Sequence, residues 1–120
     1  MPSVIRGQIV LVDFPYSDGK QGKIRPAIIV QSDQQNISLS KTIVALITGN
    51  LRRRSQSTHV FLDPSTHTDL GIHGPSVVSC INLFTIDQAA VIRIIGKLPP
   101  SLEKDLDASL GHALALAPND

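Results

Sequence analysis

The residues best suited to chemistry in this sequence are cations and a hydroxyl group that stand where predicted strands meet loops. Arg25 directly precedes Pro26, and proline pushes the residue before it into an extended conformation. We therefore expect Arg25 to hold a defined position at the start of a strand, beside a loop that carries Lys20 and Lys23. A guanidinium group matches two phosphate oxygens at once, so the arrangement favours a phosphate ligand. From these residues alone, a hairpin loop with a solvated arginine is an equal alternative.

A second group of such residues follows the next predicted strand. Thr48 ends that strand, and Arg52, Arg53 and Arg54 lie in the loop behind it. With Arg25 they offer positive charge and hydrogen-bond donors, which a phosphodiester needs while its phosphorus is pentacoordinate. RNA carries its own nucleophile, the 2′-hydroxyl, and a protein that holds such a strand in line needs no metal. The alternative for the three arginines is a solvated loop that keeps the protein soluble.

The histidines and the cysteine predict no other catalytic or metal site. None of the four histidines stands in an HxxxH or HExxH pattern and no CxxC pair occurs, so we expect neither a metal nor another cofactor. Cys80 lies within an apolar strand and is expected to be a buried structural thiol. His112 should be partly exposed on a helix. His67 and His73 flank a glycine loop, where we expect solvated side chains, with a catalytic role as the alternative.

Composition bounds the class of protein. The 120 residues fit one domain spanning residues 1–120, and 42% apolar against 18% charged residues excludes a disordered chain. Aromatic residues make up 3%, so the core must consist of Ile, Val, Leu and Ala. With a net charge of +1, any anion site must be a local cluster. One cysteine and the absence of a signal peptide or membrane span predict a cytoplasmic protein.

Short apolar runs separated by turn-forming residues predict strands that must position these side chains. They lie at residues 8–12, 27–31, 42–48, 59–62, 76–81 and 91–98. Residues 32–36 are expected to be a polar turn or loop, and residues 51–57 a basic loop. Residues 83–86 are either a turn or a continuation of the strand before them, and the last strand is either regular or ends in a bulge at Gly96.

One long helix is predicted at the C-terminal end. Ser101 is expected to be its N-cap, with Glu103 and Asp105 in the first turn, where the helix dipole favours acidic residues. Its apolar face has helical spacing, and Pro118 should close it; the apolar residues are Leu102, Leu106, Leu110, Ala113, Leu114 and Ala117. Many short strands and one terminal helix predict a mainly β fold, a small and strongly bent β-barrel capped by a C-terminal α-helix.

Several segments are similar to the MazF/PemK family of toxin ribonucleases. Residues 6–14 and 22–30, with their RG-x-I-V start and K-x-R-P-A match, resemble the opening of that family. Residues 44–48 resemble its third-strand motif and residues 58–60 its next strand. The segments S-V-V at residues 76–78 and T-I-D at residues 85–87 resemble its fifth segment. The resemblance covers most of residues 6–116, and the combination of motifs is specific.

The resemblance implies a small SH3-like β-barrel that acts as a homodimer. It also implies metal-independent cleavage of single-stranded RNA at short motifs, by attack of the 2′-hydroxyl to leave a 2′,3′-cyclic phosphate and a 5′-hydroxyl. A cognate antitoxin, expected to be an acidic chain, would cover the RNA groove. The family's catalytic arginine maps onto Arg25, which would stabilise charge and donate a proton, and its threonine maps onto Thr48, which would orient the phosphate. The expected RNA-binding residues are Lys20, Gln21, Lys23, Arg52, Arg53, Arg54, Asn82 and Phe84.

The chain departs from the family pattern after the S-V-V segment. An acidic residue and an arginine are common there, whereas this chain has Ile81 and Phe84, and Asn82 replaces a glutamine. Phe84 could stack on a base, as aromatic side chains do with splayed single strands. Two alternatives to the nuclease therefore stay open: a degenerate barrel that binds RNA or the antitoxin without cutting, and a relative that inhibits gyrase. The cleavage motif, the antitoxin's identity and the activating trigger are not encoded in any recognisable pattern.

Overall fold

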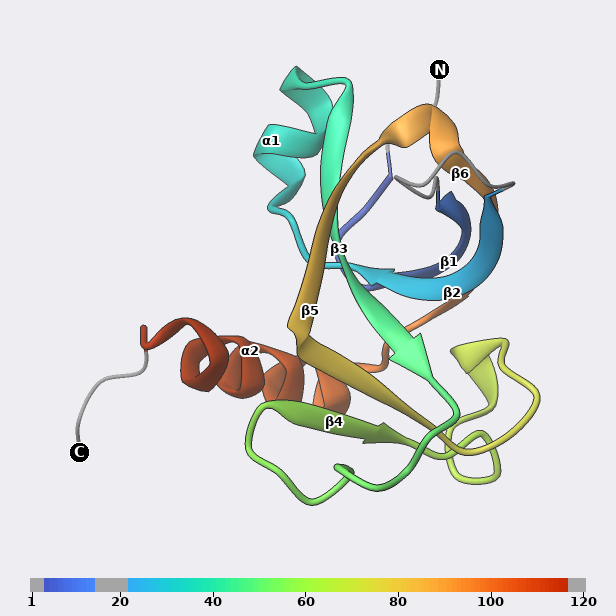
Figure 1. Cartoon of the computed structure of the whole chain (residues 1–120), viewed down its shortest axis with the longest axis vertical. Helices are drawn as coiled ribbons and strands as arrows, with labels where there is room; N and C mark the ends of the chain where they lie inside the picture. The colour runs from blue at the N-terminus through green and yellow to red at the C-terminus, as the bar shows by residue number, and fades with distance from the viewer. Residues whose placement is uncertain (1–3, 15–21, 117–120) are drawn as a thin grey trace.

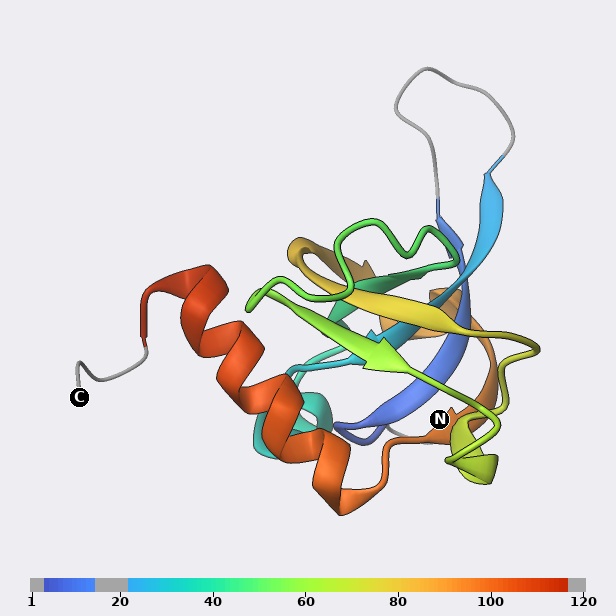
Figure 2. The same cartoon turned by 90° about the horizontal axis from the view of Figure 1, so that it is seen from below.

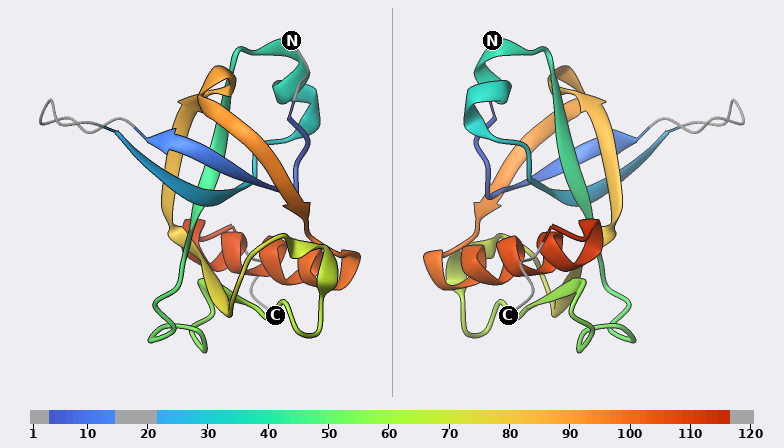
Figure 3. Two further views of the ribbon diagram at one scale, coloured as in Figure 1. Left: turned by 90° about the vertical axis from the view of Figure 1, so that its right-hand side faces the viewer. Right: turned by 90° about the vertical axis from the view of Figure 1, so that its left-hand side faces the viewer.

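The computed structural model describes residues 4–14 and 22–116, and its centre is a single curled antiparallel sheet. Six strands run in the order β4-β5-β3-β2-β1-β6, and the sheet bends into a half-barrel with a helix across one end (Figures 1 and 3). The strands are β1 (Gln8–Phe14), β2 (Lys23–Ile29), β3 (Lys41–Thr48), β4 (His59–Leu62), β5 (Ser76–Asp87) and β6 (Val91–Lys97). The helices are α1 (Asp33–Ser38), α2 (Pro100–Leu114) and the short 3₁₀ turns η1 (Thr68–Leu70) and η2 (Gln88–Ala90). This is the mainly β barrel with a C-terminal helix that the sequence predicts.

Alternation along the strands gives the sheet two different faces. One face packs against α2, and its aliphatic core includes Ile28, Ile47 and Val78 together with Leu106 of the helix. The other face lines the inside of the curl, with a core of Val10, Val12, Ala27, Ile29, Val44 and Ile86. Successive side chains of a strand point to opposite faces, so a β-branched run such as residues 9–12 supplies both cores. Both cores are aliphatic, as the composition requires.

A three-residue bulge bends β5 in its middle. The register runs from Lys41 opposite Asp87 to Ala45 opposite Leu83, and then resumes with Leu46 opposite Ser79. Residues 80–82 therefore have no partner on β3, and β5 changes direction there, as Figure 1 shows. Such bulges re-aim side chains, often beside functional sites. The continuous strand also resolves the open alternative for residues 83–86, which continue β5.

Two expectations about helices are wrong. Residues 33–38 form α1 and not a polar turn, because the Ser32 hydroxyl caps the helix by accepting from the Gln35 amide at 3.3 Å. The N-cap of α2 is Pro99 and not Ser101, since Pro100 fits the first helical turn, where its missing N–H costs nothing. The helix ends at Leu114 with Ala115 in the left-handed conformation, whereas the predicted stop at Pro118 lies outside the described residues.

The last strand contains the irregularity that the sequence left open near Gly96. The register with β1 shifts between Ile9 and Val10, so that Ile95 is the extra residue beside Gly96. A Cβ atom at Gly96 would overlap the carbonyl group of Leu70, and only glycine allows η1 to pass this close.

No helix within residues 4–14 and 22–116 is long and apolar enough to cross a membrane.

Candidate active site

Thr48 occupies the last position of β3, half-buried, at the mouth of a loop. Its hydroxyl oxygen accepts a hydrogen bond from the backbone N–H of Asn50 at 3.1 Å. A hydroxyl group has two lone pairs and one proton, so this bond leaves the proton free to be donated to a ligand. The hydrogen bond from Asn50 orients the Thr48 side chain and leaves its O–H group available as a donor. The structure therefore leaves the predicted catalytic threonine chemically available.

The loop after Thr48 is held by a series of turns. The Asn50 side chain accepts from the Arg52 amide at 3.1 Å, and the carbonyl groups of Leu51 and Arg53 accept from Arg54 and Gln56 at 3.1 and 3.0 Å. The side chains of Arg52, Arg53 and Arg54 are exposed. In Figure 2 this loop lies on one side of β4 and α2 lies on the other. The expected basic loop thus exists, and its backbone holds its cations on the sheet face away from the helix.

A cavity of about 330 Å³ gathers several of the predicted residues. It is lined by Thr48, Arg52, Arg53 and Asn82 from the predicted set, together with Leu46, Asn50, His59, Ser79 and Ile81. The predicted residues Lys23, Arg25, Arg54 and Phe84 are not part of its lining. Cations and an exposed amide thus surround one threonine hydroxyl. This arrangement can bind an anion and donate hydrogen bonds to it.

Arg25 lies on β2, half-buried and opposite Val12 of β1. The β2–β3 ladder pairs Ala27 with Leu46 and ends there. Continued by two residues, the same register would bring Arg25 opposite Thr48, and paired residues of an antiparallel ladder point to the same face. Arg25 and Thr48 therefore project from one face of the sheet, the face away from α2. The extended start of β2 agrees with the effect expected of Pro26.

Two other predicted residues lie farther along the same face. Lys23 is exposed at the start of β2, opposite Phe14. The ring of Phe84 meets the ring of Phe14 edge to face, with 5.3 Å between ring centroids, and 42% of Phe84 is exposed. Phe84 stands beyond the β5 bulge, so the bulge separates it from the cavity. Lys20 and Gln21 lie outside the described residues.

Three cavity residues escaped the sequence analysis: Asn50, His59 and Ser79. His59 and Ser79 face each other across the β4–β5 ladder, and both are buried. The Asn82 side chain turns back through the bulge and donates to the Ser79 hydroxyl at 2.7 Å. A polar residue within an otherwise apolar strand was the available signal. That signal applies to Ser79 and to His59, but it does not indicate that they share one cavity, because their meeting depends on the pairing of β4 with β5.

The electrostatics of the site keep His59 uncharged. Its pKa is lowered first by burial, which disfavours the charged ring, and then by the nearby positive charge of Arg53. The ring nitrogen Nδ1 lies 2.9 Å from the Thr58 hydroxyl. A neutral imidazole beside two arginines therefore lines the cavity.

The remaining reactive side chains lie away from this cavity. Cys80 is 1% exposed, and burial raises its pKa to about 11, so the thiol stays protonated, as expected of a structural residue. His112 is exposed near the end of α2, also as expected. His73 is exposed and His67 half-buried around η1, and neither lines the cavity. Within residues 4–14 and 22–116, no three His, Cys, Asp or Glu side chains gather closely enough to hold a metal ion.

Comparison with known proteins gives consistent matches. A family model described as PemK-like, MazF-like toxin of type II toxin-antitoxin system matches residues 5–114. The chain is 33% identical to Endoribonuclease MazF6 of Mycobacterium tuberculosis over 115 residues, which cover 94% of this chain and 98% of the relative. It is 30% identical to Endoribonuclease EndoA of Bacillus subtilis over 114 residues, covering 94% and 96%.

Solved structures share the fold. The Mycobacterium tuberculosis toxin MazF-mt6 superposes with a TM-score of 0.75 at 32% identity, covering 92% of this chain and 99% of that one. A mycobacterial endoribonuclease in complex with its cognate antitoxin superposes with a TM-score of 0.79, covering 98% and 100%, and its 23% identity supports likeness of fold.

Proposed function

The chain belongs to the PemK-like, MazF-like toxin family of type II toxin–antitoxin systems, and from this premise we propose how it acts as an endoribonuclease. It cuts single-stranded RNA at short sequence motifs and needs no metal ion. One observation carries the proposal. Thr48, Arg52 and Arg53 line a single cavity, on the sheet face from which Arg25 also projects. Cations and hydroxyl donors in this arrangement suit a phosphodiester whose nucleophile belongs to the substrate.

The reaction is an in-line displacement at phosphorus. The RNA 2′-oxygen forms a bond to the adjacent phosphorus and loses its proton to water, while the bond from phosphorus to the 5′-oxygen breaks. Arg25 stabilises the charge that develops on the phosphate oxygens and donates a proton to the departing 5′-oxygen. Thr48, whose oxygen already accepts from Asn50, donates a hydrogen bond to a phosphate oxygen and holds the phosphate in line. The products are a 2′,3′-cyclic phosphate and a 5′-hydroxyl end.

The other cations bind the RNA on both sides of the reacting phosphate. Arg52 and Arg53, which line the cavity, contact neighbouring phosphates. Arg54 and Lys23, both exposed, add further contacts to the RNA, and Lys20 and Gln21 are proposed to bind it as well. Phe84 is positioned to stack on a base because its ring is held by Phe14 and remains 42% exposed. Asn82, which lines the cavity, hydrogen-bonds a base. These contacts set the sequence preference of the enzyme. The chain makes them without the arginine that is common in the family at the position of Phe84.

Partners follow from the same surfaces. The chain acts as a homodimer, since Ile92 and Ile94 of β6, at the edge of the described sheet, are 53% and 49% exposed and offer apolar area for a second copy. Its cognate antitoxin is an acidic chain that covers the basic loop and competes with RNA there. Residues 1–120 act as one toxin domain, and the cytoplasm, which holds the messenger RNA, is where the protein acts.

Analysis of the cleavage products tests this function. Purified wild-type protein is incubated with a long RNA in the presence of EDTA, and the new ends are sequenced and analysed by mass spectrometry. We expect cuts at a short recurring motif, with 2′,3′-cyclic phosphate and 5′-hydroxyl ends. Thr48→Val is the matched variant, because it keeps the shape of the side chain and removes the hydroxyl. Absence of cutting by the wild-type protein, or 5′-phosphate ends, would overturn the proposal.

A further inference from the structure

We propose that His59 is a specificity-determining residue, whose imidazole reads the edge of the base beside the cleaved phosphate. The inference rests on the proposed RNA cleavage and deepens it, since it assigns a substrate contact to a residue that the reaction itself does not use. Three features of the structure carry it: the direction of the ring, its distance from Thr48 and its charge.

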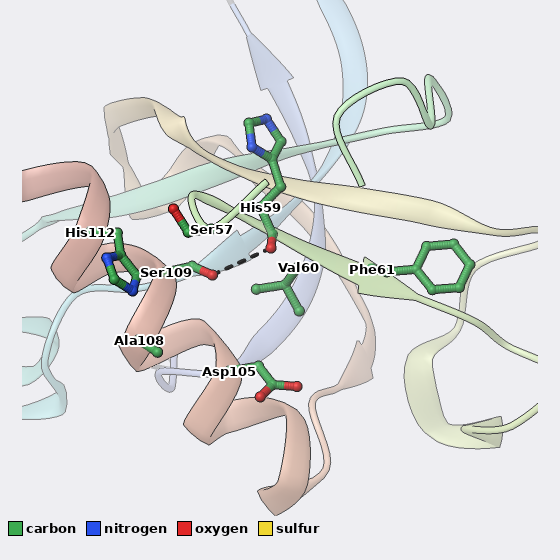
Figure 4. A pocket seen from close by; sticks show the side chains of 8 residues that line it. All are labelled: Ser57, His59, Val60, Phe61, Asp105, Ala108, Ser109 and His112. Carbon is green, nitrogen blue, oxygen red and sulfur yellow. Dashed lines mark hydrogen bonds between the residues drawn. The ribbon is translucent and has the colours of Figure 1, made fainter. Parts of the chain in front are cut away.

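The ring of His59 points into the candidate active site. Figure 4 shows it directed away from α2, on the opposite side of β4 from Ser109 and His112. The backbone of the same residue faces the helix, where its carbonyl group accepts from the Ser109 hydroxyl at 3.4 Å. Its backbone N–H donates to the Gln56 carbonyl at 3.0 Å. These two bonds hold the backbone of His59 in place, so the side chain starts from a fixed position on β4.

The free atom of the ring is Nε2. The other ring nitrogen, Nδ1, already pairs with the Thr58 hydroxyl at 2.9 Å, which fixes the orientation of the imidazole. Ser79 lies directly opposite His59, and Asn82 donates to the Ser79 hydroxyl at 2.7 Å. The carbonyl oxygen of Asn82 and the Nε2 of His59 thus supply hydrogen-bonding groups to one cavity. Such neutral groups match the polar edge of a nucleobase.

The backbone of His59 lies two strands away from that of Thr48, with β5 between them. β5 lies between β3 and β4, and neighbouring strands are about 4.8 Å apart, so His59 lies roughly 10 Å from the β3 backbone. Thr48 and His59 therefore enter the same cavity from opposite sides of β5. With the phosphate held at Thr48, a contact between His59 and the neighbouring nucleoside fits this arrangement.

The charge of the site favours the same assignment. Arg52 and Arg53 face the ring from the loop, and Asp105 and His112 lie across β4 on α2. Burial and the charge of Arg53 keep the imidazole neutral. The arginines therefore attract the phosphates, while the other side chains that line the cavity are uncharged, Leu46 and Ile81 among them. A base, and not a second phosphate, fits beside these uncharged groups.

The test compares His59→Gln with His112→Gln on a random RNA pool, with the 5′ ends of all products sequenced. Glutamine keeps a neutral hydrogen-bonding group but displaces it, so discrimination at one base position beside the cut should fall about tenfold, the effect of one mispaired hydrogen bond. Preferences at the other positions should be retained. His112→Gln alters the exposed histidine across β4 and should leave the whole motif unchanged. An unchanged motif in His59→Gln would overturn the inference.

A second result would also overturn it. If His59→Gln slows cleavage equally for all sequences and removes an ionisation from the pH profile of kcat, His59 is the proton acceptor and not a base reader. Both results require that the wild-type protein cuts RNA. Failure of the wild-type protein to cut would instead refute the proposed function, so the two failures are distinguishable.

A measurement on the wild-type protein decides the question if His59→Gln does not fold. The imidazole nitrogens are observed by NMR while an oligonucleotide that carries the preferred motif, with 2′-deoxyribose at the cut, is added. We expect the Nε2 signal of His59 to shift with this oligonucleotide and to shift less when the adjacent base is replaced. No shift, or the same shift with both oligonucleotides, would overturn the inference.

Discussion

Val78 and Ser79 are neighbours on β5, yet they face two different environments. Val78 is fully buried in the core that α2 covers, with Ile47 and Val60 beside it. Ser79 faces the opposite side, where it meets His59 and Asn82 in the candidate active site. Two adjacent residues of one strand thus contribute to different properties, Val78 to stability and Ser79 to the candidate site. In this sheet, the candidate site lies on the face that α2 leaves uncovered.

The two faces also treat their reactive groups differently. Cys80, on the covered face, has its pKa raised to about 11 by burial and stays protonated. On the open face, the pKa of His59 is lowered by burial and by Arg53, and the ring still lines a cavity where a ligand can reach it. Burial therefore keeps the Cys80 thiol protonated and unreactive on the covered face. On the open face, burial favours the uncharged form of His59, which can still contact a ligand. Substitutions on the two faces should have separable effects.

The largest effect is expected on the covered face. Leu106 of α2 is fully buried, and Leu106→Ala should lower the free energy of unfolding by about 3 to 5 kcal/mol, because it leaves a cavity in a packed core. Chemical denaturation measures this change. The fraction that remains folded should cut RNA at the wild-type rate. A loss of activity in that folded fraction would show that the helix-covered face also shapes the site.

The next effect is expected on the open face. Arg25→Ala should reduce kcat for RNA cleavage by about 10² to 10³, the usual consequence of removing one donor that stabilises transition-state charge. The free energy of unfolding should change little, because Arg25 is half-buried at the start of β2 and outside both cores. Arg25→Lys, which keeps the charge and loses the bidentate fork, should recover part of the rate. Cleavage at the wild-type rate by Arg25→Ala would remove Arg25 from the mechanism.

The sequence predicts the covered face better than the open one. Strand positions follow from apolar runs, and the spacing of Leu102, Leu106 and Leu110 is enough to predict the face of α2, because burial in a core depends on local periodicity. Arg25 and Thr48 were identified at strand ends beside loops, and the register agrees that they share a face. Local pattern thus predicts the strands, the buried face of α2 and the position of these two residues at strand ends.

The rest of the site depends on long-range geometry that local pattern does not encode. The bulge at residues 80–82 brings Asn82 back to Ser79 and places Phe84 outside the cavity. No residue type in this segment predicts a bulge. His59 belongs to the site only because β4 pairs with β5, and not with the strand that precedes it in the chain. The helical turn at residues 33–38 was missed for a related reason. Its sequence is polar, and a single serine cap at Ser32 is a weak signal beside that polarity.

A pH dependence of stability is the third expected effect and again belongs to the covered face. The Cys80 thiol has a pKa of about 11 when folded against 9.0 for the free group, so unfolding releases a proton once the pH exceeds about 9. Its contribution is fully present below pH 9 and is lost as the pH rises through about 11, a change on the order of 2 kcal/mol. Denaturation curves from pH 8 to 11 measure it. Cys80→Ala should show a smaller decline, and an equal decline would assign the effect to other groups.

The smallest effect should separate two neighbouring arginines on the open face. Arg53 lines the cavity and Arg54 does not, although both are exposed on the same loop. Arg53→Ala should raise KM for RNA by about fivefold with little change in kcat, because exposed ion pairs contribute modestly, and Arg54→Ala should raise it less.

Each lost phosphate contact should also lower the slope of log affinity against log salt concentration by about 0.7. Binding of a 2′-deoxy oligonucleotide at several salt concentrations measures both quantities. Equal effects of the two variants would mean that the loop attracts RNA as a diffuse charge, and that the cavity does not select which arginine the RNA contacts.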